Sequence, residues 1–160
     1  MSYPCDRIAA MDIDGFWRLI ERSAPEPDRD AWLTGTLRKL ARVHIEDFEI
    51  LLQECRDRID NAATWAAAYV VYDGHCSGDS FRYFQCWLIG QGRAAFERVA
   101  AAPDALATLP AIQRLAGRTF RAWDDDEWPD REALAGVAAG AYPDDSLEDV
   151  LAERGFRRRE

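Results

Sequence analysis

The sequence contains no apolar run of the roughly 20 residues that a membrane-spanning helix needs. Its first residues, MSYPCDRIAAMD, lack the basic and hydrophobic regions of a signal peptide. Histidine occurs only twice, and the sequence has no phosphate-binding glycine loop, dinucleotide fingerprint, nucleophile elbow, CxxC or HExxH motif. We therefore expect a cytoplasmic protein with no membrane span, no cofactor and no metal.

Basic residues are outnumbered, which gives a formal net charge of −9. Binding to nucleic acid depends on neutralising phosphates with lysine and arginine, so this balance argues against a nucleic-acid partner. It favours a basic protein or peptide as the partner of any charged interaction. Excess acid that only keeps the chain in solution explains the same charge.

Four cysteines are present, and none forms a close pair in the sequence. We expect them to be reduced thiols. Cys76 follows His75 in the loop DGHCSGD, and such residues can ligate zinc or act as nucleophile and base. Adjacent side chains rarely point at one metal, so the pattern is better explained as an ordinary turn.

The length of 160 residues and the apolar fraction of 48% are typical of one globular domain. No segment reads convincingly as a strand, so the prediction is an all-α fold of about six to eight helices. We expect an N-terminal segment over 1–11 and a helical domain over 12–142. A C-terminal helix and basic tail over 143–160 should pack on the same domain.

Two aspartates predict the starts of the first two helices. Asp12 can cap a helix that stops before Pro25, and Asp28 can cap a second one. The second helix should face inward with Trp32, Leu33, Leu37 and Leu40.

The third predicted helix has an apolar stripe from Ile45 to Ile59, and its charged residues occupy the remaining face. This pattern predicts a surface helix. The next segment, TWAAAYVVY, is small or apolar on all sides and predicts a second buried helix, although YVVY alone would also suit a strand.

The segment from Asp79 to Gly92, DSFRYFQCWLIGQG, predicts a helix that is apolar around almost its whole circumference. Such a helix belongs in the middle of a fold. We expect Asp79 or Ser80 to cap it, and Arg82 and Gln85 to share one narrow sector. A buried arginine needs partners, which makes this sector a candidate site.

Three stretches of the sequence are distinctive, which are Phe16-Trp17 with Leu19-Ile20, GDSFRYFQCWLIGQGR from Gly78 to Arg93, and Phe96 followed by Pro103-Asp104-Ala105-Leu106. In these stretches the chain resembles the bacterial family catalogued as domain of unknown function 4240 (DUF4240). The resemblance implies a compact, mainly helical bacterial protein and brings no reaction or catalytic residue. The family pattern favours an arginine where this chain has Gln85.

The central helix supports two interpretations. In the first, Asp79, Arg82 and Tyr83 line a polar pocket, Arg82 binds a carboxylate or phosphate, and Gln85 or Gln91 fixes its orientation. In the second, Asp79 caps the helix and Arg82 pairs with a carboxylate of another helix. Both interpretations predict the same sequence.

A second candidate site is WDDDEW, where Trp123 and Trp128 flank Asp124, Asp125 and Asp126. The acids could coordinate a hard divalent cation or receive a basic segment of a partner, and the tryptophans could add stacking or cation–π contacts. The alternative is a solvated acidic loop that its aromatic ends anchor.

Two functions remain open from sequence. The one we favour is a non-catalytic accessory module that binds a protein or peptide. The other is a small enzyme or small-molecule-binding domain that uses the pocket around Asp79 and Arg82.

Overall fold

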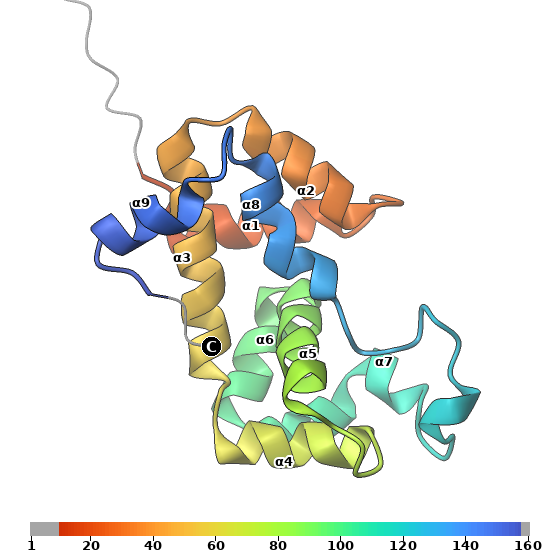
Figure 1. Ribbon diagram of the computed structural model, residues 1–160. Helices are drawn as coiled ribbons and strands as arrows, with labels where there is room; N and C mark the ends of the chain where they lie inside the picture. The colour runs from red at the N-terminus through yellow and green to blue at the C-terminus, as the bar shows by residue number, and fades with distance from the viewer. Residues whose placement is uncertain (1–9, 158–160) are drawn as a thin grey trace, which may run out of the picture.

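The computed structural model describes residues 10–157 (Figure 1). Within this range the regular elements are all helical, which confirms the all-α prediction. The α-helices are α1 (Ile13–Ser23), α2 (Arg29–Arg38), α3 (Arg42–Arg58), α4 (Ala62–Val71), α5 (Gly78–Gly90), α6 (Arg93–Ala101), α7 (Pro110–Gln113), α8 (Val137–Ala141) and α9 (Leu147–Glu153). Short 3₁₀ helices are η1 (Pro103–Thr108), η2 (Phe120–Ala122) and η3 (Glu132–Gly136).

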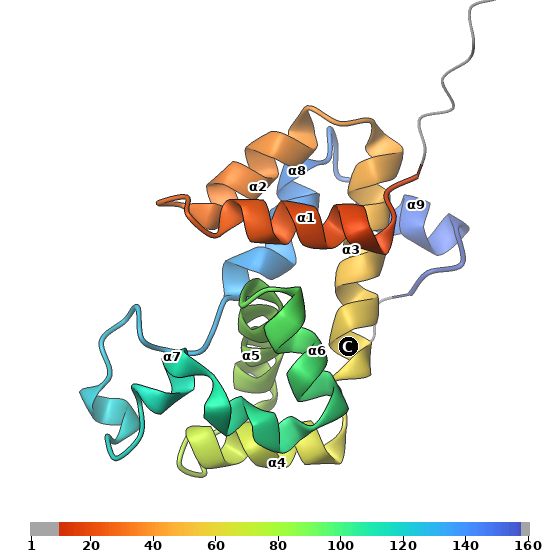
Figure 2. The ribbon, with the colours of Figure 1, turned by 180° about the vertical axis from the view of Figure 1, so that it is seen from behind.

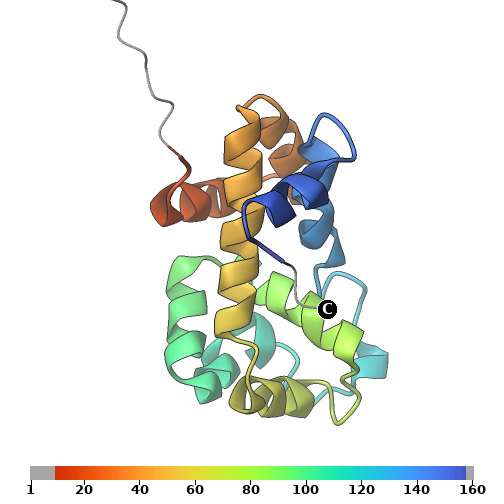
Figure 3. The same cartoon turned by 60° about the vertical axis from the view of Figure 1, so that its left-hand side comes forward.

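The long helix α3 connects two groups of helices (Figures 1 and 3). One end of α3 packs with α1, α2 and α8, and its other end leads to α4, near α5 and α6. Figure 2 shows α1 lying across one group and α4 lying across the base of the other. No helix of residues 10–157 is both long enough and apolar enough to cross a bilayer.

Local sequence explains where the first helices begin. The Asp12 carboxylate accepts a hydrogen bond from the Gly15 backbone N–H at 2.7 Å. Asp28 does the same for Ala31 at 3.0 Å. Both predicted caps are confirmed, since each satisfies a backbone donor that the first turn of a helix leaves free.

Aromatic side chains from three helices meet in the core. Phe16 packs against Phe48 with ring centroids 5.1 Å apart, and Trp17 packs against Phe96 at 5.2 Å. Phe81, Phe84, Leu88 and Ile89 of α5 are also buried. The prediction of a buried central helix near residues 79–90 is therefore confirmed.

The prediction that α3 lies on the surface is wrong. Its apolar stripe is buried, and so are three of its charged residues, Glu46, Asp47 and Arg56. Arg154, just beyond α9, donates to Glu46 at 2.8 Å and to Asp47 at 2.7 Å. Because this partner lies more than a hundred residues further along the chain, the local pattern could not indicate it.

The inward face of α2 is shorter than predicted. Leu33 and Leu37 are fully buried, but Leu40 is 38% exposed. The helix ends at Arg38, so Leu40 lies beyond the helical repeat that would have turned it inward.

Candidate functional site

The start of α5 differs from the prediction. Ser77, not Asp79 or Ser80, caps the helix, because its hydroxyl accepts a hydrogen bond from the Ser80 backbone N–H at 3.2 Å. Asp79 lies in the first turn with its side chain exposed, where its charge favours the helix N-terminus.

Arg82 is exposed, so the prediction of a buried arginine at this position is wrong. It forms no ion pair with any carboxylate of residues 10–157. Gln85, one turn further along the helix, is buried. The sector that the two residues share therefore runs from solvent at Arg82 into the protein at Gln85.

The buried arginine beside this sector is Arg56 of α3. Its Nε donates to Oε1 of Gln85 at 3.4 Å, and its Nη1 donates to Oε1 of Gln53 at 3.3 Å. Sequence reasoning placed Arg56 on the outer face of a surface helix and so missed it. The available signal was Gln85, a polar residue on a buried helix that needs a polar partner from elsewhere.

These side chains line a polar pocket of about 320 Å³ at the junction of α3, α4 and α5. The pocket brings together Asp79, Arg82 and Gln85, three of the candidates from the sequence. The residues that line it are Gln53, Arg56, Asp57, Asp60, Trp65, Gly78, Asp79, Phe81, Arg82 and Gln85. Trp65 and Phe81 form an aromatic wall, with their rings stacked at 4.1 Å between centroids.

Two other candidates lie outside this pocket. The Tyr83 hydroxyl donates to Oε1 of Glu132 at 3.1 Å, and this hydrogen bond is the main reason that the pKa of Tyr83 is raised. Gln91 follows α5, and its Nε2 donates to the Trp87 carbonyl at 3.4 Å. Neither residue lines the polar pocket with Arg82.

The acidic segment forms an exposed turn with an aromatic base. Trp123 is buried, and its ring meets that of Trp128 edge to face at 5.1 Å. Both rings also lie near Tyr72. Only the acids between them, Asp124, Asp125 and Asp126, are freely exposed.

A bidentate ion pair closes this turn. Arg118 donates to both carboxylate oxygens of Glu127, at 2.7 and 2.8 Å. The hydrogen bonds from Arg118, together with one from the Asp124 backbone, lower the pKa of Glu127 to about 2. The charge of Arg118 is thus neutralised within the protein.

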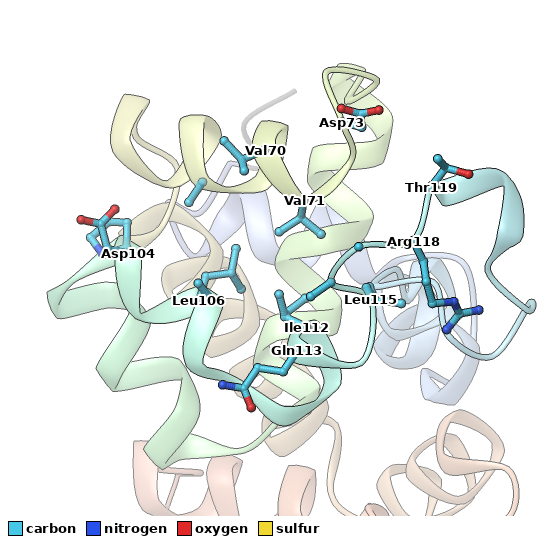
Figure 4. A pocket seen from close by; sticks show the side chains of 15 residues that line it. Val70, Val71, Asp73, Asp104, Leu106, Ile112, Gln113, Leu115, Arg118 and Thr119 are labelled. Atoms are coloured by element: carbon cyan, nitrogen blue, oxygen red, sulfur yellow. The ribbon is translucent and has the colours of Figure 1, made fainter.

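An apolar groove of about 530 Å³ was not predicted from sequence (Figure 4). Its walls come from α4, η1 and α7, with Val70 and Val71 on one side and Leu106, Ile112 and Leu115 on the other. The prediction that α4 is buried on all sides is wrong, because Val70 is 78% exposed.

A second hollow of about 410 Å³ extends this surface along α4, and both share Ala67, Val70, Pro103 and Asp104. The residues that α4 contributes are Ala63, Ala66, Ala67 and Val70, at positions i, i+3, i+4 and i+7. This spacing marks one face of a helix. The spacing is visible in the sequence. It did not predict a groove, because a helix face of small residues shows the same spacing when it is buried.

The thiols of the described residues are free and poorly ionised. Burial raises the pKa of Cys55 to about 12 and that of Cys86 to about 11, and it also raises that of Cys76. His75 is exposed, and its Nδ1 lies 2.8 Å from the Asp73 carbonyl. Within residues 10–157, no three histidine, cysteine or carboxylate side chains are grouped as metal ligands would be. Cys5 lies outside the described residues.

The fold and its hollows define an all-α domain with an apolar groove and a separate polar pocket. The chain belongs to the family described as protein of unknown function (DUF4240), whose model matches residues 11–144. This match confirms the resemblance and covers α1 to α8. Comparison with curated proteins and with solved structures gives no match.

Proposed function

We propose that this domain is a non-catalytic module that binds a basic, amphipathic helical segment of a partner protein in the groove beside α4. The observation that carries the proposal is the exposed apolar face of α4 facing Leu106, Ile112 and Leu115 (Figure 4). Helices commonly bind partners by laying an apolar stripe into such a groove. The alanines of α4 would let the backbone of a bound helix approach closely.

Charge supports a basic partner. The charged residues on the rim of the groove are Asp73, Asp104 and Arg118. Arg118 is neutralised by Glu127, whereas neither aspartate forms an ion pair within the part of the chain that the structure describes. Arg118 lines the groove and contacts Glu127, which directly follows the acids of residues 124–126. A bound helix with lysines or arginines at its ends would find complementary charge.

We also propose that this binding takes place in the cytosol. Cys55, Cys76 and Cys86 are free thiols. Free cysteines are usual where cellular reductants prevent disulfides from persisting.

The test uses a synthetic helical peptide with leucines at i, i+3, i+4 and i+7 and lysines on its remaining face. A second peptide has glutamate in place of each lysine. We expect the basic peptide to bind, as measured by calorimetry, and to perturb the NMR signals of Ala67 and Val70. The acidic peptide should bind at least about tenfold more weakly.

Two variants give a matched comparison. Val70→Gln removes an exposed apolar contact of the groove and should weaken binding about tenfold. Val43→Gln changes another exposed valine, at the start of α3, and should leave affinity unchanged. The proposal is wrong if the basic peptide does not bind, if both peptides bind equally, or if Val70→Gln binds as well as Val43→Gln.

A further inference from the structure

The polar pocket contains a buried arginine, Arg56, that forms no ion pair with any carboxylate of the described residues. Arg56 is only 9% exposed. Removing a charge from water is costly unless an opposite charge or good hydrogen bonds compensate for it. The residues that the structure describes supply only two long hydrogen-bond acceptors, the amide oxygens of Gln85 at 3.4 Å and Gln53 at 3.3 Å.

The surrounding network holds the guanidinium group in one orientation. Gln53 Nε2 donates to Oδ1 of Asp57 at 3.0 Å, and Gln85 Nε2 approaches the Arg56 carbonyl at 3.5 Å. These contacts direct both amide oxygens towards the guanidinium group, where they accept from Nε and Nη1. Nη2 makes no hydrogen bond to any described residue and is not fully enclosed, and Arg56 lines the pocket, so Nη2 is left available to a ligand.

The rim of the pocket has the opposite charge. Asp57, Asp60 and Asp79 line it, together with one exposed cation, Arg82. A phosphate or another multiply charged anion would be repelled by this rim. A ligand with one carboxylate and one cationic group matches both the floor and the rim.

We propose that this pocket binds a free α-amino acid. The carboxylate of the ligand pairs with Arg56, and its ammonium group lies among the rim aspartates. The pocket volume of about 320 Å³ is at the small end of ligand sites and suits a molecule of this size. Trp65 and Phe81 provide an apolar wall for the ligand's side chain. The site shares no residue with the apolar groove, so it goes beyond the proposed function.

The experiment titrates the full, isotope-labelled chain with each of the common L-amino acids up to about 10 mM, in the range of weak metabolite affinities. NMR follows the side-chain amides of Gln53 and Gln85 and the Nε–H of Arg56. We expect at least one amino acid to shift these signals saturably. For that amino acid, the amine without its carboxylate and the acid without its ammonium should each bind at least about tenfold more weakly.

Arg56→Met keeps the aliphatic volume and removes the charge, and it should abolish binding without lowering stability. Arg98→Met removes an exposed arginine of α6 and should leave binding intact. If Arg56→Met does not fold, Asp79→Asn at the exposed rim provides a second test. This variant should bind the amino acid about tenfold more weakly. The proposal is overturned if no amino acid shifts the pocket signals, if inorganic phosphate binds and amino acids do not, or if Asp79→Asn binds normally.

Discussion

Nη1 of Arg131 lies so close to the backbone of Gly90 that a methyl group added to this glycine would stand 2.6 Å from it. Nη2 of Arg131 donates to Oδ1 of Asp30 at 2.5 Å, and Nη2 of Arg29 donates to the Gly90 carbonyl at 2.8 Å. Gly90 is the last residue of α5, where two guanidinium groups complement the partial negative charge of the helix C-terminus. The close approach depends on the missing side chain.

Gly90→Ala should therefore lower the free energy of unfolding by about 1–3 kcal/mol, the range for overpacked sites. Arg131 cannot move away freely, because its side chain is only 10% exposed and is paired with Asp30. Urea denaturation monitored by circular dichroism measures the change. In an Arg131→Ala background the clash is gone, so the cost of Gly90→Ala should shrink.

Gly35 provides the control. It lies inside α2, and a methyl group built there meets no atom within 4 Å. Gly35→Ala should raise the free energy of unfolding by up to about 1 kcal/mol, the difference in helix propensity. Equal effects at the two glycines would contradict the role of the contact with Arg131.

The ion pairs of Arg154 predict a second stability effect. Arg154→Ala would leave Glu46 and Asp47, with side chains only 10% and 9% exposed, without their cation. The carboxylates are buried but Arg154 is 35% exposed, so we expect a loss of about 1–3 kcal/mol, the cost of leaving a buried polar group without its partner. Arg93→Ala breaks the exposed pair with Asp14 and should cost much less, because solvent screens both charges. Chemical denaturation of both variants checks the difference, and similar small losses would show that α9 does not stabilise α3 in this way.

The sequence predicted what depends on neighbouring residues. Asp12 and Asp28 cap their helices as expected, because a cap and the N–H that it accepts from lie three residues apart. The apolar circumference of residues 79–90 likewise predicted the burial of α5. Both signals are contained within a single helix.

What the sequence could not predict depends on contacts between distant segments. The polar face of α3 looks like a surface face until Arg154 is brought against it. The candidate pocket was placed around Arg82, although the buried arginine there is Arg56, which meets Gln85 from a different helix. The apolar groove could not be predicted because the solvent-facing side of α4, with Tyr69 and Val70, and its core-facing side, with Trp65 and Ala68, both mix small and large apolar residues.

Buried thiols predict a loss of stability at alkaline pH. Burial raises the pKa of Cys55 to about 12 and that of Cys86 to about 11, from 9.0 in both cases. Above pH 9 the unfolded chain loses these protons, whereas the folded protein keeps them. The stabilisation is therefore complete below pH 9 and decreases as the pH rises towards 11–12. Each thiol should contribute a slope of about 1.4 kcal/mol per pH unit within its window.

The measurement is the free energy of unfolding between about pH 8 and about pH 10.5, around the ordinary thiol pKa. Cys86→Ala should be less stable at every pH but should show a shallower decline above pH 9. Tyr72, whose pKa burial also raises, adds to the decline at the upper end and remains in both proteins. Identical slopes in the two proteins would show that Cys86 ionises as easily when folded as when unfolded.

We expect the exposed acids between Trp123 and Trp128 to affect the binding of the basic peptide but not the free energy of unfolding. Its closing contacts are made by Glu127 with Arg118, not by the exposed acids, and its tryptophans pack inward. Replacing Asp124, Asp125 and Asp126 with asparagine should therefore change the free energy of unfolding by no more than about 0.5 kcal/mol. The same change should weaken the binding of the basic helical peptide and flatten its salt dependence, because it removes three negative charges from the turn that Glu127 closes against Arg118, a residue of the groove.

A matched variant separates position from net charge. Asp145→Asn, Asp149→Asn and Glu153→Gln remove three exposed acids around α9, which lies away from α4 (Figure 1). Both triple variants have the same net charge, so a general effect of charge would weaken their binding of the basic peptide equally. Only the variant at residues 124–126 should lose affinity if the acidic turn extends the binding surface. Equal losses would restrict the role of the turn to keeping the chain in solution.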